Sequence, residues 1–385
     1  METQFETDSM KPFPVLRPVP DYLRDAVRGF QSAPSITSSP GGRLWLAWHT
    51  GDVTEGDENA AIVATSGDGG ENWGEPLFAI DKPGPLRVID PGLWTDPSGK
   101  VWLFYSQCYS FWDGRAGVWA MNPLDPEDAA TAWTPARRLC DGFMKNKPVV
   151  RRDGAWLLPP EFSNFPPRHG KTMHALCDLA GPLAHPECAR QSANAYVSTD
   201  GGATVSFLGA AEIPPEDRDC TENMIVERRD GTLWMLARTR YGIGEAFSAD
   251  GGATWTQLKP SGIKSTNSRF FIGRLKSGAL LLVKNGDVAM GTPEERPYTP
   301  REKITAFVSD DDGRTWLGGL LLDGRADVSY PDACETPDGF IHVVHDRGRT
   351  TDREILHHRF TEADVRAGKL VTSGSRLLGI ANKAG

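Results

Sequence analysis

A glutamate and an arginine flank a hairpin-like stretch in the middle of the chain. Glu222 opens it, an Asp-Gly turn follows at Asp230 and Gly231, and Arg238 ends the apolar run after the turn. This spacing places both side chains at one end of a hairpin. A carboxylate there could act as a base, and a guanidinium could grip a carboxylate through two parallel hydrogen bonds. An ordinary surface hairpin is the structural alternative.

Two further segments place reactive side chains next to apolar runs. Arg269 lies directly before Phe270, Phe271 and Ile272, and Tyr330 lies between Val328 and Asp332. A free phenol has a pKa near 10, so a tyrosine acts as a nucleophile only with a base within hydrogen-bond reach. A surface salt bridge for the arginine and a half-buried tyrosine are the structural alternatives.

Carboxylates gather in two loops nearer the N-terminus. The loop after the apolar run that ends at Trp48 contains Asp52, Glu55 and Asp57, and Asp90 stands before a proline. A carboxyl group in such a loop could transfer protons as a general acid or base. The acidic loop could equally be a solvated surface, and Asp90 a turn residue.

The elements that must position these side chains are marked by an eight-residue pattern, S-x-D-x-G-x-x-W. It occurs four times, at Ser66–Trp73, Ser198–Val205, Ser248–Trp255 and Ser309–Trp316, and only the second copy lacks its final tryptophan. Ser and Asp side chains bond backbone amides within turns, and glycine allows a positive φ. Each copy therefore predicts a hairpin turn with an aromatic anchor.

A second repeat counts the structural units. A glycine turn followed by an apolar strand occurs six times, beginning at Gly42, Gly99, Gly154, Gly231, Gly278 and Gly339. Repeats at such spacings indicate propellers or solenoids, and strands of nearly continuous apolar residues suit burial on both faces. The sequence therefore predicts an all-β, six-bladed β-propeller with four-stranded blades.

The predicted propeller is a single domain over residues 1–385, with one insertion at about 159–194. The step between Gly154 and Gly231 is the longest, 77 residues, and the insertion inside it is rich in proline. Proline at that density favours a loop excursion, which we expect to cover one face of the propeller. The insertion carries charged and cysteine side chains, namely Arg168, His169, Lys171, His174, Cys177 and Cys188.

Composition limits the classes of partner. The net charge of −9 argues against nucleic acid, so an anionic ligand would need a local basic pocket. No stretch is apolar enough to insert into a membrane, and no Cys-x-x-Cys pair predicts a zinc site. The polar N-terminus predicts no signal peptide in this sequence, and the compartment stays open: cytoplasmic, or secreted or periplasmic after removal of a signal.

The four turns on six units resemble the Asp-boxes of the sialidase (neuraminidase) superfamily, over about Arg28 to Arg359. Asp-boxes are structural and also occur in non-catalytic propellers, so the activity must be argued from other residues. The resemblance implies a divergent, BNR-repeat glycoside hydrolase that removes a terminal sialic acid or related acidic sugar from a glycan. It implies neither a metal nor an organic cofactor.

The resemblance also implies roles for the singled-out residues. Tyr330 would be the nucleophile, Glu222 the base that activates it, and Glu55 the general acid, with Asp52 and Asp57 as alternatives. A neutral phenol suits an anionic sugar, which would repel a carboxylate nucleophile. The substrate-binding residues would be Arg238, Arg269, Arg28 and Asp90.

One departure from the family pattern leaves the substrate open. Sialidases usually begin with Arg-Ile-Pro, and Ser32 stands here where that arginine would be, with Arg28 four residues earlier. A site with two matching arginines leaves room for a uronic acid or another ulosonic acid. The alternatives to a sialidase are a polysaccharide lyase or other glycosidase acting on uronic-acid-containing glycans, and a non-catalytic glycan-binding propeller whose candidate residues do not converge.

Overall fold

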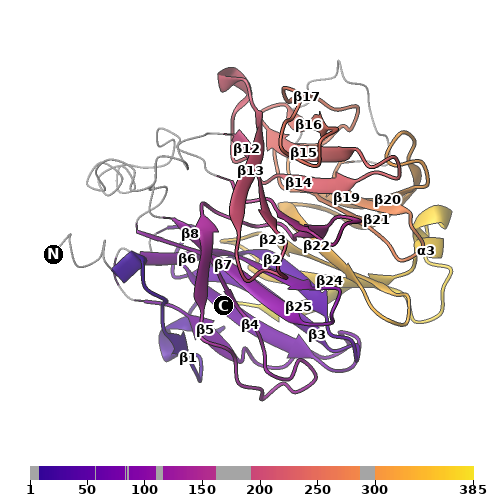
Figure 1. The fold of residues 1–385 in the computed structure, drawn as a ribbon. Helices are drawn as coiled ribbons and strands as arrows, with labels where there is room; N and C mark the ends of the chain where they lie inside the picture. Colours follow the sequence, from indigo (N-terminus) through magenta and orange to yellow (C-terminus); the bar gives the residue numbers. More distant parts are fainter. Residues whose placement is uncertain are drawn as a thin grey trace.

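The computed structural model describes residues 8–56, 58–82, 84, 86–109, 116–161, 192–286 and 300–385. These residues form six antiparallel sheets arranged as the blades of a β-propeller (Figure 1), which confirms the predicted all-β, six-bladed fold. Asp57 and most of the proline-rich insertion lie outside the described residues, which leaves out Arg168, His169, Lys171, His174, Cys177 and Cys188. The strand β12 (Ser192–Ser198) already begins inside the range expected for the insertion.

Each blade is built from consecutive strands. Blades one to three are β2 (Phe30–Ser38), β3 (Leu44–Gly51), β4 (Ala60–Ser66) and β5 (Phe78–Ile80); β6 (Leu86–Thr95), β7 (Val101–Tyr109), β8 (Gly117–Met121) and β9 (Arg137–Asp141); β10 (Val149–Val150), β11 (Trp156–Leu158), β12 and β13 (Ser206–Glu212). The short strand β1 (Val15–Leu16) pairs with the outer strand of blade one.

Blades four to six are β14 (Met224–Glu227), β15 (Leu233–Thr239), β16 (Gly242–Ser248) and β17 (Lys259–Pro260); β18 (Phe271–Arg274), β19 (Leu280–Asn285), β20 (Glu302–Ser309) and β21 (Leu317–Ala326); β22 (Val328–Glu335), β23 (Ile341–Arg347), β24 (Glu354–Phe360) and β25 (Arg376–Lys383). One helix, α3 (Glu362–Ala367), follows β24, and two short 3-10 turns lie at Asp21–Leu23 and Pro215–Asp217. No described helix has the length and apolar character needed to cross a membrane.

The glycine repeat marks the turn into the second strand of every blade. All six glycines have φ between 83° and 94°, the left-handed region that side chains disfavour. Around Gly42, Gly154, Gly231 and Gly339 there is open space for a Cβ atom, so backbone conformation rather than crowding requires glycine there. The strands that follow are buried on both faces because each sheet packs against its neighbours.

The Asp-boxes form the turns between the third and fourth strands of four blades. In the last copy, Ser309 bonds Asp311 at 2.9 Å, and Asp311 accepts from the amide of Thr315 at 2.8 Å. A Cβ atom on Gly313 would lie 2.4 Å from the ring of Trp234 in the preceding blade. The predicted turns are therefore present, and they also pack one blade onto the next.

The C-terminal residues contact the segment that leads into blade one. The amide of Gly385 donates to the carbonyl of Asp25 at 2.7 Å, and Arg28 bonds Asn382 of β25 at 2.7 Å. The inner strand β2 contacts β6 on one side and β22 on the other, so the six inner strands surround a central channel. The ring is closed by side-chain and loop contacts between blades one and six.

Candidate active site

Three inner strands, and the segment just before a fourth, have residues with unusual backbone conformation near one mouth of the channel. Ala33, Asp90, Glu222 and Tyr330 all have positive φ, between 37° and 58°. The strands around Ala33, Asp90 and Tyr330 are bulged at these positions. Non-glycine residues in this region are strained and cluster at functional sites, and a bulge re-aims a side chain.

Glu222, Tyr330 and Arg238 form one hydrogen-bonded group. The Tyr330 hydroxyl donates to Glu222 Oε1 at 2.5 Å, and Arg238 Nη1 donates to the same carboxylate oxygen at 3.0 Å and to the phenol oxygen at 2.8 Å. All three side chains are buried, and Asn146 anchors the Glu222 backbone through its carbonyl at 2.7 Å. The phenol therefore lies within proton-transfer distance of a carboxylate.

Lys145 joins this group to Asp90. Its ammonium lies 3.0 Å from Glu222 Oε1 and 3.2 Å from Asp90 Oδ1, and 4.9 Å from the centre of the Tyr330 ring. Asp90 is buried beside His49, whose Nδ1 accepts from the Asp90 amide at 3.3 Å. The structure thus brings Asp90 into the same site.

The charges set the protonation states. Burial alone would raise the pKa of Glu222, but Arg238 and Lys145 hold it well below the usual range. Burial and the charge of Glu222 raise the pKa of Tyr330, which keeps the phenol protonated at rest. Burial also raises the pKa of Asp90, against the effect of Lys145. The resting site holds a neutral phenol and an ionised partner, as a base-activated nucleophile requires.

Glu55 lies at the edge of this site. Its side chain is 31% exposed, and its Oε1 lies 3.7 Å from Arg87 Nη2. Burial opposes ionisation, but His49 and the cations Lys145, Arg87 and Arg349 lower the pKa of Glu55 to about 2. Of the two alternatives from the same loop, Asp52 is exposed and Asp57 is outside the described residues.

The other two singled-out arginines point elsewhere. Arg269 is buried deeper in the channel, where it bonds Asn146 Oδ1 at 2.7 Å and Asp332 Oδ1 at 3.2 Å. Arg28 is buried at the join between blades one and six, against Asp25 and Asn382, with its guanidinium 5.7 Å from the Trp48 ring. Neither guanidinium contacts Tyr330 or Glu222.

Ser32 is tied to an arginine from blade six. Ser32 donates to Asp346 Oδ2 at 2.8 Å, and Arg349 Nε lies 3.2 Å from the same oxygen. The other Asp346 oxygen accepts from Ser329 at 2.6 Å. Arg349 is thereby held over the Tyr330 ring, at 4.2 Å from its centre.

Arg301 adds another cation on the same ring. Its guanidinium carbon lies 5.4 Å from the Tyr330 ring centre, and its one described hydrogen bond goes to the carbonyl of Asn267 at 3.4 Å. Burial and the charge of Arg349 lower the pKa of Arg301. Like charges held this close favour an anion between them.

The sequence analysis did not single out Lys145, Arg301, Arg349 or Asp346. Arg349 lies just after the second strand of its blade, and Glu55 lies after the second strand of blade one. Arg238 is the last residue but one of the second strand of blade four. Since those loops lie at one mouth, the position after the second strand of a blade is the signal that could have identified the 348–353 loop. Lys145 carries no such signal, because it lies in an irregular segment before the two-residue strand β10.

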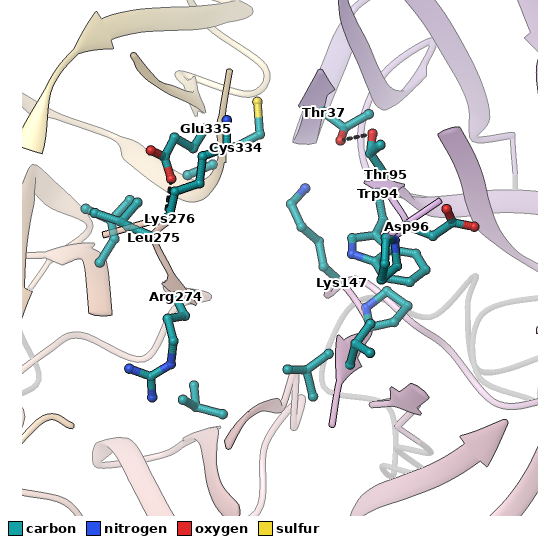
Figure 2. Close-up of a pocket in the computed structure, with 18 of the residues that line it drawn as sticks. Thr37, Trp94, Thr95, Asp96, Lys147, Arg274, Leu275, Lys276, Cys334 and Glu335 are labelled. Atoms are coloured by element: carbon teal, nitrogen blue, oxygen red, sulfur yellow. Dashed lines mark hydrogen bonds between the residues drawn. The ribbon is translucent and has the colours of Figure 1, made fainter. Parts of the chain in front are cut away.

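Asp332, Lys147 and Arg269 form a cluster of charged side chains in the channel, which we call the channel plug. Asp332 accepts from Ser35 at 2.6 Å and from Lys147 at 2.5 Å, and it also binds Arg269. Beyond the plug, the far ends of the inner strands line a hollow of about 780 Å³. Figure 2 shows its labelled residues, including Lys276, whose amide donates to Glu335 at 2.7 Å. Within the described ranges, no group of three or more His, Cys, Asp and Glu side chains could hold a metal ion.

Comparison with known proteins identifies the fold. A protein of unknown function from Dyadobacter fermentans is 15% identical with a TM-score of 0.62, over 88% of this chain and 96% of that one. A leech intramolecular trans-sialidase is 13% identical with a TM-score of 0.64, over 91% and 71%. A Streptococcus pneumoniae sialidase is 13% identical with a TM-score of 0.59, over 86% and 67%. No curated protein matches the chain.

At these identities the solved structures establish the fold alone. The family assignment comes from a family model described as "BNR repeat-like domain", which matches residues 34–343, most of the chain. The chain therefore belongs to the BNR repeat-like family.

Proposed function

We propose that this protein is a retaining exo-glycoside hydrolase that removes a terminal acidic sugar, sialic acid or a related acid, from a glycan. The observation that carries the proposal is the short hydrogen bond from Tyr330 to Glu222, 2.5 Å long, with Arg238 on both groups. A phenol paired with an ionised carboxylate is an activated nucleophile. The alternative of a non-catalytic propeller gives no reason for these strained, buried groups to meet.

In the first chemical step, the Tyr330 oxygen bonds to the anomeric carbon as the bond to the leaving oxygen breaks. Glu222 Oε1 takes the phenol proton, and Glu55 gives a proton to the leaving oxygen. In the second step, Glu55 takes a proton from water, and the water oxygen bonds to the anomeric carbon as the bond from that carbon to the Tyr330 oxygen breaks. The released phenol oxygen regains its proton from Glu222. Two displacements at one carbon retain its configuration.

The cations around Tyr330 supply the site for the substrate's acid group. Arg238, Arg301 and Arg349 approach the phenol from blades four, five and six, and Arg349 is held there by Asp346. A guanidinium binds a carboxylate through two parallel hydrogen bonds. An anion among these groups would also weaken their effect on Glu55 and raise its pKa from about 2 towards the range of a proton donor.

The test is hydrolysis of an aryl α-glycoside of sialic acid by the wild type and by Tyr330→Phe. Removing the hydroxyl should abolish turnover while leaving the fold intact. Tyr22→Phe is a matched control, because the Tyr22 hydroxyl also donates to a carboxylate, Asp81, at 2.7 Å, but outside the site. Equal activity of the wild type and Tyr330→Phe would refute the proposed nucleophile.

A polysaccharide lyase is the second candidate, favoured by the same three arginines around a tyrosine. Guanidinium groups that neutralise a uronic acid's carboxylate would acidify the neighbouring carbon, and a tyrosinate could remove its proton. If the sialoside is inert, a panel of uronic-acid glycans separates the two activities. A lyase releases a 4,5-unsaturated product that absorbs ultraviolet light, and a hydrolase does not.

A further inference from the structure

Lys145 occupies a fixed position beneath the reacting groups. Its side chain is 6% exposed, and its ammonium lies between Glu222 at 3.0 Å and Asp90 at 3.2 Å. The carbonyl of the same residue accepts from Arg269 at 3.2 Å, and the amide of Met144 donates to Ser106 at 3.0 Å. The ammonium is therefore held on its two carboxylates.

The surroundings of Lys145 are strongly anionic. Four carboxyl groups interact electrostatically with its ammonium. Asp90 and Glu222 form ion pairs with it, and Glu55 and Glu161 lie nearby. The other titratable groups that face this cluster are Tyr330, Cys220, His49 and Arg238. Burial lowers the pKa of His49 to about 3, so its ring is neutral at physiological pH.

The contacts of Glu222 are distributed unevenly between its two oxygens. Oε1 meets Tyr330, Arg238 and Lys145, all within 3.0 Å, whereas Oε2 is buried with no hydrogen-bond partner among the described residues. Two cations thus share one oxygen. Arg238 also faces the phenol oxygen, so an anionic substrate bound there competes with Glu222 for its positive charge.

We infer that Lys145 is a positioning residue: it keeps Glu222 ionised and directed at Tyr330 while Arg238 is engaged by the anionic group of the substrate. This inference rests on the proposed function. Without Lys145, occupation of Arg238 would leave a buried carboxylate facing Asp90 and Glu161 with no counterion of its own. Such a carboxylate would bind a proton and cease to act as a base.

The test compares the pH dependence of turnover in the wild type and Lys145→Met. Loss of an adjacent opposite charge raises a carboxyl pKa by about one to three units, so the acidic limb of kcat should move to higher pH by that amount. The acidic limb of kcat/KM should move less, because Arg238 still contacts Glu222 in the free enzyme and kcat/KM reports that state.

Two variants control for structural damage. Lys147→Met removes another buried ammonium, 2.5 Å from Asp332 in the channel plug, and should leave the acidic limb in place. Lys145→Arg retains the charge and should restore the wild-type limb. If Lys145→Met does not fold, the double variant Asp90→Asn/Lys145→Met is used instead. It removes both charges of the Lys145–Asp90 ion pair and leaves the net charge unchanged.

A readout without turnover separates this inference from the proposed function. Carbon-13 NMR titration of labelled glutamate side chains, assigned with Glu222→Gln, should place the Glu222 pKa well below the usual range in the wild type and higher in Lys145→Met. A titration shift without turnover on any glycan would overturn the proposed function alone. If Lys145→Met turns over substrate with its acidic limb of kcat unmoved, or if the limb moves equally in Lys147→Met, the proposed role of Lys145 is overturned.

Discussion

The sharpest test of the site asks which arginines bind the anionic group of the substrate. It compares substitutions of Arg349, which faces Tyr330, with substitutions of Arg28, which does not. Arg349 faces Asp346 with its Nε, donates to Ser329 through one Nη group and also hydrogen-bonds with the Tyr330 side chain, so its guanidinium reaches the candidate nucleophile directly. A carboxylate there could accept two hydrogen bonds. Bonds to charged groups contribute about 1.5–3 kcal/mol each.

Replacing Arg349 by methionine should therefore cost about 3–6 kcal/mol of substrate binding, or about two to four powers of ten in kcat/KM. Lysine keeps the charge and one of the two bonds, so Arg349→Lys should lose about ten- to hundredfold. Steady-state kinetics on the aryl sialoside measures both losses, and most of each should appear in KM.

Arg28→Lys is the matched control, because Arg28 is buried at the join between blades one and six and not in the site. It should lower the melting temperature and leave KM unchanged. The reasoning from the geometry is refuted if Arg28→Lys raises KM and Arg349→Lys does not. That outcome would mean that the guanidinium of Arg28 reaches the substrate, as the sequence comparison alone had proposed.

Three further predictions concern stability. Burial, followed by the charge of Glu222, raises the pKa of Glu161 to about 7. Between pH 4.5 and 7 the unfolded chain has released this proton while the folded protein retains it, so the free energy of unfolding falls as pH rises. Glu161→Gln should remove this slope and gain up to about 3 kcal/mol at pH 7, measured by denaturant unfolding. Gly313→Ala should destabilise by about 2–5 kcal/mol, because the positive φ costs about 1–2 kcal/mol and a Cβ atom 2.4 Å from Trp234 adds about 1–3 kcal/mol. Gly339→Ala, with the same positive φ but open space, should lose only the backbone cost of about 1–2 kcal/mol. Asp311→Ala should cost about 1 kcal/mol by leaving the Thr315 amide without its acceptor, and an unchanged thermal midpoint would contradict that role.

The fold was predictable because its determinants are local. A glycine with positive φ before an apolar run, as at Gly231, specifies a hairpin whatever surrounds it, and six repeats of that signal specify six blades. The Asp-box bonds span only a few residues, so they too depend on the sequence alone. Glu222 and Arg238 could be placed together because they flank one hairpin, whereas Tyr330 was joined to them by the resemblance to sialidases.

The destinations of the remaining arginines could not be predicted in this way. A long guanidinium side chain goes to whichever buried acceptors the tertiary structure offers. Arg28 finds Asn382, which lies 354 positions away in sequence, and Arg269 finds Asp332 in the channel plug. The contact of Ser32 with Asp346, which also binds Arg349, likewise depends on the tertiary structure.

The join between blades one and six determines what a truncation at the C-terminus would disturb. In the part of the chain that the structure describes, no strand from one end joins the blade at the other end, so these sheets would keep their hydrogen bonds if Ala384 and Gly385 were removed. The contacts of Ala384 with Arg353 and of Gly385 with Asp25 would be lost. Because Ser32 and Arg349 lie on opposite sides of that join, trimming the C-terminus should weaken the contacts of both with Asp346 while most of the β-structure persists.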